Sequence, residues 1–351
     1  MIVYCLGCAA SSLMAYLCSN TSKRKSNRAV AVFFSALPLI LISALRYDVG
    51  YDYLPTYVGY FDLVKNEMVN SQNRLEWLWH LINKALALLN ADYMWLFAVA
   101  ALLFFTSVYS EIFRASPYPA LSVFLLTGMG YLFVSFNAVR QMIGCGILLY
   151  AVRYIEERKL WKFLLCVVVA GGFHNSCYVF CITYWLSRIR IKPLTSFTMT
   201  AVMVILMEPL SRLIHYIISR TGYQLYIDSI FDTGETAYVF LAINLMLLVF
   251  ASVLYRDEPR YRIYYLFQNL ALWITIYSGQ VVLILRMMWA FGLPSIILIP
   301  LSIEKLADKK ERSIVMAILV LMYFLYTMYT VGIQNSNNVL PYQTIFTRWL
   351  S

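Results

Sequence analysis

Long apolar runs recur along the whole chain and constrain its fold more than any other feature. A helix needs about 20 residues to cross a bilayer, and only helices and closed barrels satisfy their backbone there. Of the 351 residues, 61% are hydrophobic and 13% are charged, and that charged fraction is about half of what a soluble domain carries. Ten such runs lie at 1–20, 29–45, 93–109, 118–136, 140–155, 194–208, 236–254, 263–280, 283–303 and 313–331. The sequence therefore predicts an all-α membrane bundle of about ten transmembrane helices, forming one domain over 1–351.

The net charge of +10 indicates topology rather than nucleic acid binding, because Lys and Arg accumulate in cytoplasmic loops. Basic residues 23–28 follow the first apolar run, which predicts an uncleaved anchor whose N-terminus lies outside. If residues 163–187 cross once, the 28 Lys and Arg divide into 13 inside and 15 outside. If that segment enters the membrane and returns, they divide into 19 inside and 9 outside. The positive-inside rule favours the second division, so we predict a membrane hairpin at 163–187 and both termini outside.

This topology leaves two long segments, 46–92 and 209–235, on the outer side. Within the first, residues 75–89 have an apolar face, which is typical of a helix lying in the membrane interface. Charges near helix ends in a membrane are costly and usually have a partner, although snorkelling to lipid headgroups is the simplest explanation for any single one. The nine basic residues on the outer side are Arg46, Lys65, Arg74, Lys84, Arg140, Arg212, Arg220, Arg286 and Arg348.

Several of these arginines indicate an anion site. Asn137 is expected to cap the helix that follows it, so Arg140 and Gln141 would lie in the first turn of that helix. A cation there opposes the helix dipole, whereas a bound phosphate would reverse that penalty. Arg286 lies in an apolar run, near the outer end of its helix, and Arg46 ends the second helix. Together they predict an outward-facing site for a phosphate-bearing, lipid-linked ligand.

Three side chains are candidate proton acceptors for such a site. His174 follows two glycines at the expected turn of the hairpin, although a lone histidine is also commonly a packed core residue. Asp48 could act as a base or simply pair with Arg46. Asp52 could act as a base or cap a helix. No cluster of His, Cys and acidic residues has the spacing of metal ligands, so we expect no metal and no other cofactor.

In their order along the chain, these motifs resemble those of the EpsG-type exopolysaccharide polymerases, a Wzy-like family. The resemblance rests on the loop of residues 46–53 (RYDVGYDY), the N-x-x-R-Q motif at 137–141 and the Phe-His pair at 173–174. Arg286 and the Pro-Tyr pair at 341–342 resemble later motifs of the family. The sequence departs from the family after Glu76, where the expected glycine is missing, and this weakens any role assigned to Glu76 by resemblance.

The resemblance implies a bacterial inner-membrane glycosyltransferase that makes O-antigen or exopolysaccharide, with 46–92 and 209–235 as periplasmic loops. Such an enzyme would transfer the growing undecaprenyl-diphosphate-linked glycan to a hydroxyl of a new lipid-linked repeat unit without a metal. Its partners would be that donor, that acceptor and the bilayer, and binding of a chain-length regulator is left open. The implied catalytic residues are His174, Asp48, Arg140 and Arg286, and the implied substrate-binding residues are Arg46, Tyr51, Asp52, Asn137 and Gln141.

Two other functions remain open at this point. An O-antigen ligase-like enzyme would use the same donor with a lipid A-core acceptor, but the order of the motifs argues against it. A transporter or flippase of lipid-linked oligosaccharides would need alternating access, and such proteins usually contain internal repeats. We find no internal repeat in this sequence.

Overall fold

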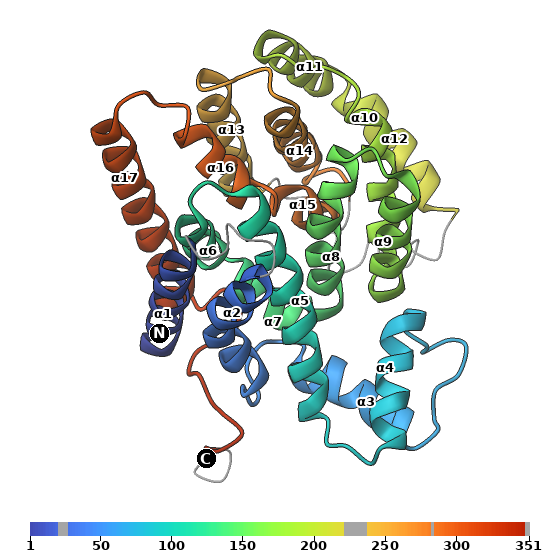
Figure 1. The fold of residues 1–351 in the computed structure, drawn as a ribbon. Helices are drawn as coiled ribbons and strands as arrows, with labels where there is room; N and C mark the ends of the chain where they lie inside the picture. The colour runs from blue at the N-terminus through green and yellow to red at the C-terminus, as the bar shows by residue number, and fades with distance from the viewer. Residues whose placement is uncertain (20–26, 221–236, 282–283, 348–351) are drawn as a thin grey trace.

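The computed structural model describes residues 1–19, 27–220, 237–281 and 284–347, and every element in these ranges is a helix (Figure 1). The prediction of an all-helical membrane protein is confirmed at this level. Three described segments are long and apolar enough to cross a membrane, or up to six if each of three bent helix pairs is one span. The three are α1 (Ile2–Ser19), α5 (Met94–Ala115) and Lys309–Ile333, which joins α17 (Lys309–Thr327) to η6 (Met328–Ile333).

The predicted number of about ten full spans is not supported, because several apolar runs are broken or short. Gly130 has a φ of 87°, and the chain bends there by 51° between two helices. The other two bent pairs have angles of 68° and 40°. These pairs are α6 (Pro119–Gly128) with α7 (Tyr131–Asn137), α11 (Pro193–Ile205) with α12 (Met207–Ile218), and α15 (Ile284–Gly292) with α16 (Ser295–Ile303).

The remaining long helices fall short for two reasons. Some are apolar but contain fewer than 18 residues, namely α2 (Arg28–Ala44), α9 (Leu160–Phe173) and α13 (Tyr238–Val253). Two others, α8 (Val139–Glu156) and α14 (Pro259–Ile276), are 18 residues long but are interrupted by polar side chains. Short helix length and polar side chains inside the bundle thus both contribute to the difference from the expected number of spans.

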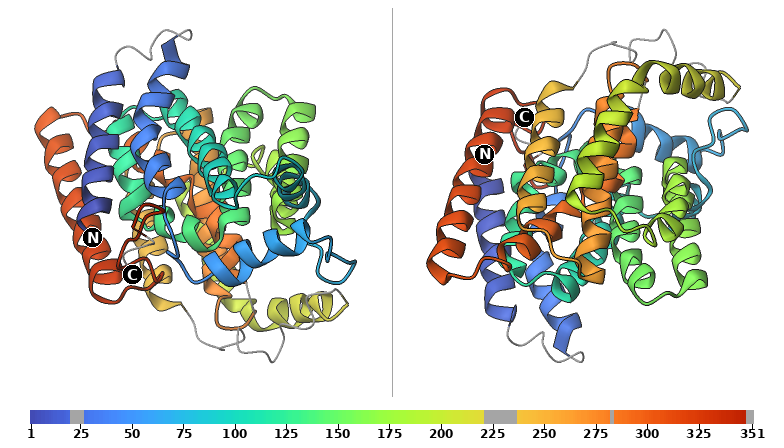
Figure 2. Two further views of the ribbon diagram at one scale, coloured as in Figure 1. Left: turned by 90° about the horizontal axis from the view of Figure 1, so that it is seen from below. Right: turned by 90° about the horizontal axis from the view of Figure 1, so that it is seen from above.

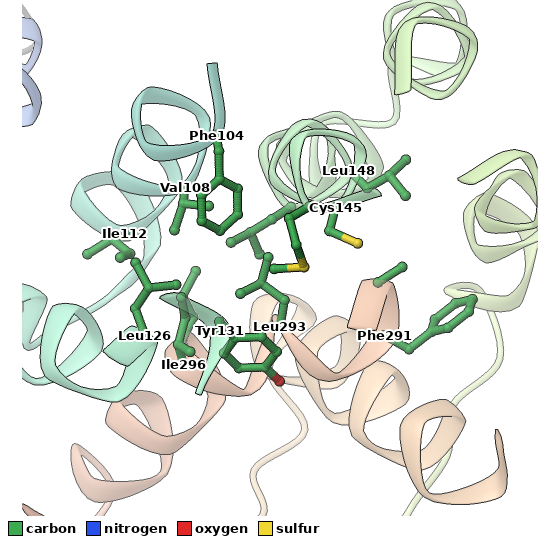
Figure 3. Close-up of a cluster of buried hydrophobic side chains, with 14 of the residues drawn as sticks. Phe104, Val108, Ile112, Leu126, Tyr131, Cys145, Leu148, Phe291, Leu293 and Ile296 are labelled. Atoms are coloured by element: carbon green, nitrogen blue, oxygen red, sulfur yellow. The ribbon is translucent and has the colours of Figure 1, made fainter. Parts of the chain in front are cut away.

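The core lies where α5, α7, α8, α15 and α16 meet, with side chains such as Phe104, Cys145 and Ile296 packed together (Figure 3). Helices α1 and α17 lie at one edge of the bundle, and α4 and α9 lie at the opposite edge (Figures 1 and 2). The edge helices present large apolar side chains outward, for example Leu6 on α1 and Ile318 on α17. Such faces suit a protein that is surrounded by lipid.

Ion pairs and a hydrogen bond connect the C-terminal ends of α5 and α8 with the start of α14. The buried carboxylate of Glu111 pairs with Arg114 and with Arg153, and it accepts a hydrogen bond of 2.9 Å from the Tyr264 hydroxyl. Glu156, the last residue of α8, pairs with Arg114 and with Arg260. These residues come from three helices, so the network fixes one end of the bundle.

The segment at 163–187 folds back on itself. Helix α9 ends at Phe173, and the chain returns through the 3-10 helix η4 (Asn175–Ile182) and the short α10 (Thr183–Leu186). Its two ends meet, because Arg158 Nη1 donates to Ser187 Oγ at 3.4 Å. Whether both ends face the cytoplasm stays a prediction.

Residues 46–92 leave the bundle and form what we call the outer-loop unit. It contains the π-helical η3 (Tyr53–Val58), α3 (Gly59–Lys65) and α4 (Trp77–Leu88), and it lies beneath α8 and α9 in Figure 1. Helix α4 covers most of the predicted interfacial helix at 75–89. In the second outer segment, residues 209–218 belong to α12, whereas 221–235 lie outside the described residues, as does Arg348.

Candidate functional site

Arg140 joins the bundle to the outer-loop unit. It lies in the first turn of α8, where its Nη1 donates to a carboxylate oxygen of Glu76, the residue that precedes α4. Both side chains are largely buried. The Nε of Arg140 is buried and has no hydrogen-bond partner among the described residues. An unsatisfied buried donor costs about 1–3 kcal/mol, so this nitrogen would gain from an anionic partner if the site opened to a ligand.

His174 lies beside this ion pair. It follows α9 in an extended conformation, with φ −156° and ψ 123°, and its Nδ1 is 2.8 Å from Ser176 Oγ. Its Nε2 makes no hydrogen bond to a described residue. Gly172 lies against Trp77, the neighbour of Glu76, so the structure brings His174 near an ion pair that is far away in sequence.

Gln141 connects the elements around His174. Its Nε2 donates to the backbone carbonyl of Arg286 on α15 and lies 3.5 Å from Ser176 Oγ on η4. The side chain of Arg286 is exposed and forms no ion pair with a described residue. We call Arg140, Gln141, His174 and Arg286 the arginine–histidine cluster.

The two glycines before His174 make room for neighbouring side chains. A Cβ atom at Gly171 would overlap the ring of Tyr178 on η4. A Cβ atom at Gly172 would lie 2.7 Å from the Trp77 ring on α4. Packing within the chain therefore accounts for both glycines. Close packing of α9 against η4 and α4 holds His174 near Glu76.

Arg46, which was also predicted to belong to the anion site, has a different environment from Arg140. It is 3% exposed, and its guanidinium lies 4.8 Å from the Phe97 ring centroid and 4.4 Å from that of Phe136. Its Nη2 donates to the Phe136 carbonyl at 3.2 Å. No described acidic residue pairs with it, so the suggested pairing with Asp48 does not occur. Arg46 therefore has the surroundings of a packing residue.

The Tyr53 ring also lies 5.8 Å from the Arg46 guanidinium, and the other predicted site residues of the 46–53 loop have different surroundings. Asp48 is exposed and has a φ of 49°, and Tyr51 is also exposed. Asp52 precedes η3, as the capping interpretation expected, but its carboxylate accepts from the Thr56 hydroxyl at 3.3 Å rather than from a backbone N–H. We call Arg46, Asp48, Tyr51, Asp52 and Asn137 the loop cluster.

The capping role predicted for Asn137 is wrong. Asn137 is the last residue of α7, and Ala138 takes the N-cap position of α8. The bend after α7 turns the Asn137 side chain away from the start of α8, and its Nδ2 donates to the Asn337 carbonyl at 3.0 Å. The placement of Arg140 and Gln141 in the first turn of α8 is nevertheless confirmed.

Sequence reasoning overlooked Tyr57 and gave Glu76 little weight. The Tyr57 hydroxyl donates to the Asn137 carbonyl at 2.5 Å and accepts from the Val139 N–H at 2.8 Å, so it fastens the α7–α8 junction. One signal was present for Glu76, because it is an acidic residue at the start of an amphipathic segment on the same predicted side as Arg140. Nothing in the local sequence distinguishes Tyr57 from the other 27 tyrosines.

No group of three or more His, Cys, Asp or Glu side chains in the described ranges is arranged to hold a metal ion. The fold and this site define a helical membrane protein with a cationic polar centre next to an outer-loop unit. The chain belongs to the EpsG family, whose sequence profile matches residues 29–344, and the resemblance inferred from the motifs is thereby confirmed. Membership supports a polysaccharide polymerase-like role at the level of the family. No curated protein and no solved structure is significantly similar to this chain.

Proposed function

We propose that this protein is a bacterial surface polysaccharide polymerase that acts at the outer face of the inner membrane. The acceptor hydroxyl of a new lipid-linked repeat unit attacks the anomeric carbon of the growing glycan. The bond from that carbon to the diphosphate oxygen breaks, and undecaprenyl diphosphate leaves with the bonding electron pair. The hydroxyl proton passes to a base on the protein. The reaction therefore needs a cationic group for the leaving diphosphate and a proton acceptor near it.

The observation that carries the proposal is the linkage of α8, η4 and α15 through Gln141, which brings His174 and Arg286 near Arg140, whose buried Nε has no hydrogen-bond partner among the described residues. Diphosphate oxygens would accept from Arg140 Nε and from the exposed guanidinium of Arg286. Charge-assisted hydrogen bonds of this kind are the strong ones in proteins. They would stabilise the charge that develops on the leaving oxygen.

His174 is the proposed base. Its Nδ1 accepts from the Ser176 N–H at 3.4 Å and lies 2.8 Å from Ser176 Oγ. To accept the hydroxyl proton at Nε2, the neutral ring would take the other tautomer, in which Nδ1 carries the hydrogen and donates to Ser176 Oγ. The alternative base, Asp48, belongs to the loop cluster and is exposed. Proximity to Arg140 therefore supports His174 over Asp48.

Glu76 is the proposed positioning residue for Arg140. Before substrate binds, its carboxylate holds one Nη of the guanidinium, so the other donors of the planar fork keep a fixed direction. A diphosphate would share the guanidinium with Glu76.

A deletion strain tests the proposal against both alternatives. If the protein is a polymerase, the strain should attach single repeat units to its surface acceptor and should make no long chains. Repeat units that accumulate on the lipid carrier, with none on the lipid A-core, would indicate a ligase instead. Lipid-linked units trapped on the cytoplasmic side would indicate a flippase. Purified protein that elongates lipid-linked units in liposomes would supply the direct measurement.

A further inference from the structure

A polar cavity of about 320 Å³ lies between α3 and α4, on the outer-loop unit and apart from the arginine–histidine cluster. Four of its lining residues are polar or charged, namely Lys65, Glu67, His80 and Lys84. The lining also includes apolar residues, among them Val64 and Leu88. A cavity lined by both polar and apolar side chains suits a sugar ring, which has hydroxyl groups at its edge and C–H groups on its faces.

The polar lining residues carry more positive than negative charge. Neither Lys65 nor Lys84 forms an ion pair with a described residue, and Glu67 is the only carboxylate in the lining. His80 Nδ1 is 2.9 Å from the Tyr60 hydroxyl, which leaves Nε2 as its open nitrogen. Burial, followed by the charges of Arg74 and Lys84, lowers the pKa of His80, so the imidazole is neutral at pH 7. The two ammonium groups therefore favour an anionic ligand.

The cavity and the proposed active centre share one helix. Glu76, His80 and Lys84 are spaced four residues apart, so they follow one another along the same side of α4. At 1.5 Å per residue, His80 and Lys84 lie about 6 and 12 Å along the axis from Glu76, which contacts Arg140. The cavity is therefore lined from the same helix whose preceding residue contacts Arg140.

We propose that this cavity is a subsite for an acidic sugar, such as a uronic acid or a sugar with an acidic substituent, in the glycan that the enzyme handles. The inference rests on the proposed function and deepens it, because it assigns a chemical class to the substrate. Lys65 and Lys84 bind the acidic group, His80 Nε2 binds a hydroxyl group, and the apolar lining residues contact a face of the ring.

The test uses the full-length protein in lipid nanodiscs and two probes with the same sugar chain, the charged trigalacturonate and its uncharged, fully methyl-esterified form. Trigalacturonate should bind at least about tenfold more tightly than the ester, and added salt should reduce the difference. Lys65→Gln and Lys84→Gln should each weaken binding of trigalacturonate about two- to fivefold, as expected for exposed charge pairs. Lys162→Gln, an exposed lysine on α9, is the matched control and should bind as the native protein does.

Arg140→Ala separates this inference from the proposed function. That variant should lose polymerisation but keep the preference for trigalacturonate over its ester. Equal binding of the two probes would overturn the subsite, as would native affinity for trigalacturonate in the Lys65→Gln, Lys84→Gln double variant. A source polysaccharide without any acidic group would overturn it as well. A native protein that prefers trigalacturonate but never elongates lipid-linked units would keep the subsite and refute the polymerase.

Discussion

The arginine–histidine cluster and the loop cluster each contain an arginine at a helix end, yet the two arginines have opposite environments. Both have a buried Nε without a hydrogen-bond partner among the described residues, but Arg140 contacts a carboxylate whereas Arg46 is enclosed by aromatic rings. The same residue type is therefore suited to anion binding in one place and to packing in the other. The comparison shows that the role of an arginine near a membrane surface depends on the residues that surround it. Substitutions in the two clusters should have separable effects on activity and on stability.

The most decisive experiment concerns the side of the membrane on which the arginine–histidine cluster lies, because its result is all or none. A cysteine at Lys192, just beyond the folded-back segment, should be protected from an impermeant maleimide in intact cells and labelled after permeabilisation. The contact of Arg158 with Ser187 is the physical reason, since it places both ends of that segment together.

Cysteines at Asn66 and Lys310 serve as the controls for this labelling, because both positions are exposed and are predicted to face opposite sides. Ready modification of the Lys192 position in intact cells would refute the hairpin and the sidedness of every later helix.

His174→Gln should cause the largest loss of activity. Removal of a general base costs typically about 10²- to 10⁴-fold, and the measurement is polymer formation per molecule of enzyme in liposomes. Ser176→Ala should cause a smaller loss, because it removes only the partner of Nδ1. Asp48→Asn is the matched change in the loop cluster and should be close to native. Full-length polymer from His174→Gln would reduce His174 to a packing residue, and a loss confined to Asp48→Asn would assign the base to Asp48.

Arg140→Ala and Arg286→Ala should each reduce polymerisation by about 10- to 150-fold, since a hydrogen bond to a charged group contributes about 1.5–3 kcal/mol. Arg140→Lys should also be impaired, because lysine keeps the charge but lacks the planar fork. Arg140→Ala leaves Glu76 unpaired, so the double variant with Glu76→Gln shows how much of the loss comes from that carboxylate. Normal chain length in both alanine variants at normal membrane levels would place the anion site elsewhere.

Arg46→Ala should have the smallest effect on activity per folded molecule and the clearest effect on folding. Cation–π contacts with buried rings contribute up to about 2 kcal/mol each, and alanine would also leave a cavity between Phe97 and Phe136. The measurements are thermal unfolding in detergent and the amount of protein in the membrane. If Arg46→Ala has native stability but makes no polymer, Arg46 binds the substrate as first predicted and is not merely a packing residue.

Much of the helical layout was predictable, because apolar runs report directly on where helices can form in lipid. The runs at 29–45, 140–155 and 236–254 correspond to α2, α8 and α13 within a few residues. The number of spans was not predictable in the same way. Whether a run such as 118–136 is one helix or two depends on the left-handed backbone at Gly130, which a hydrophobic pattern does not record.

The sequence by itself determined that this chain is a helical membrane protein, which family it resembles and which of its polar residues are costly to place. Those properties follow from composition, charge distribution and local motifs. Tertiary structure decided which polar residues meet: it joined Glu76 to Arg140, placed His174 beside them and enclosed Arg46 in aromatic rings. Glu76 and His174 are nearly a hundred positions apart, and no local pattern encodes their proximity. Packing of α4 and α9 at Gly172 brings the two segments together.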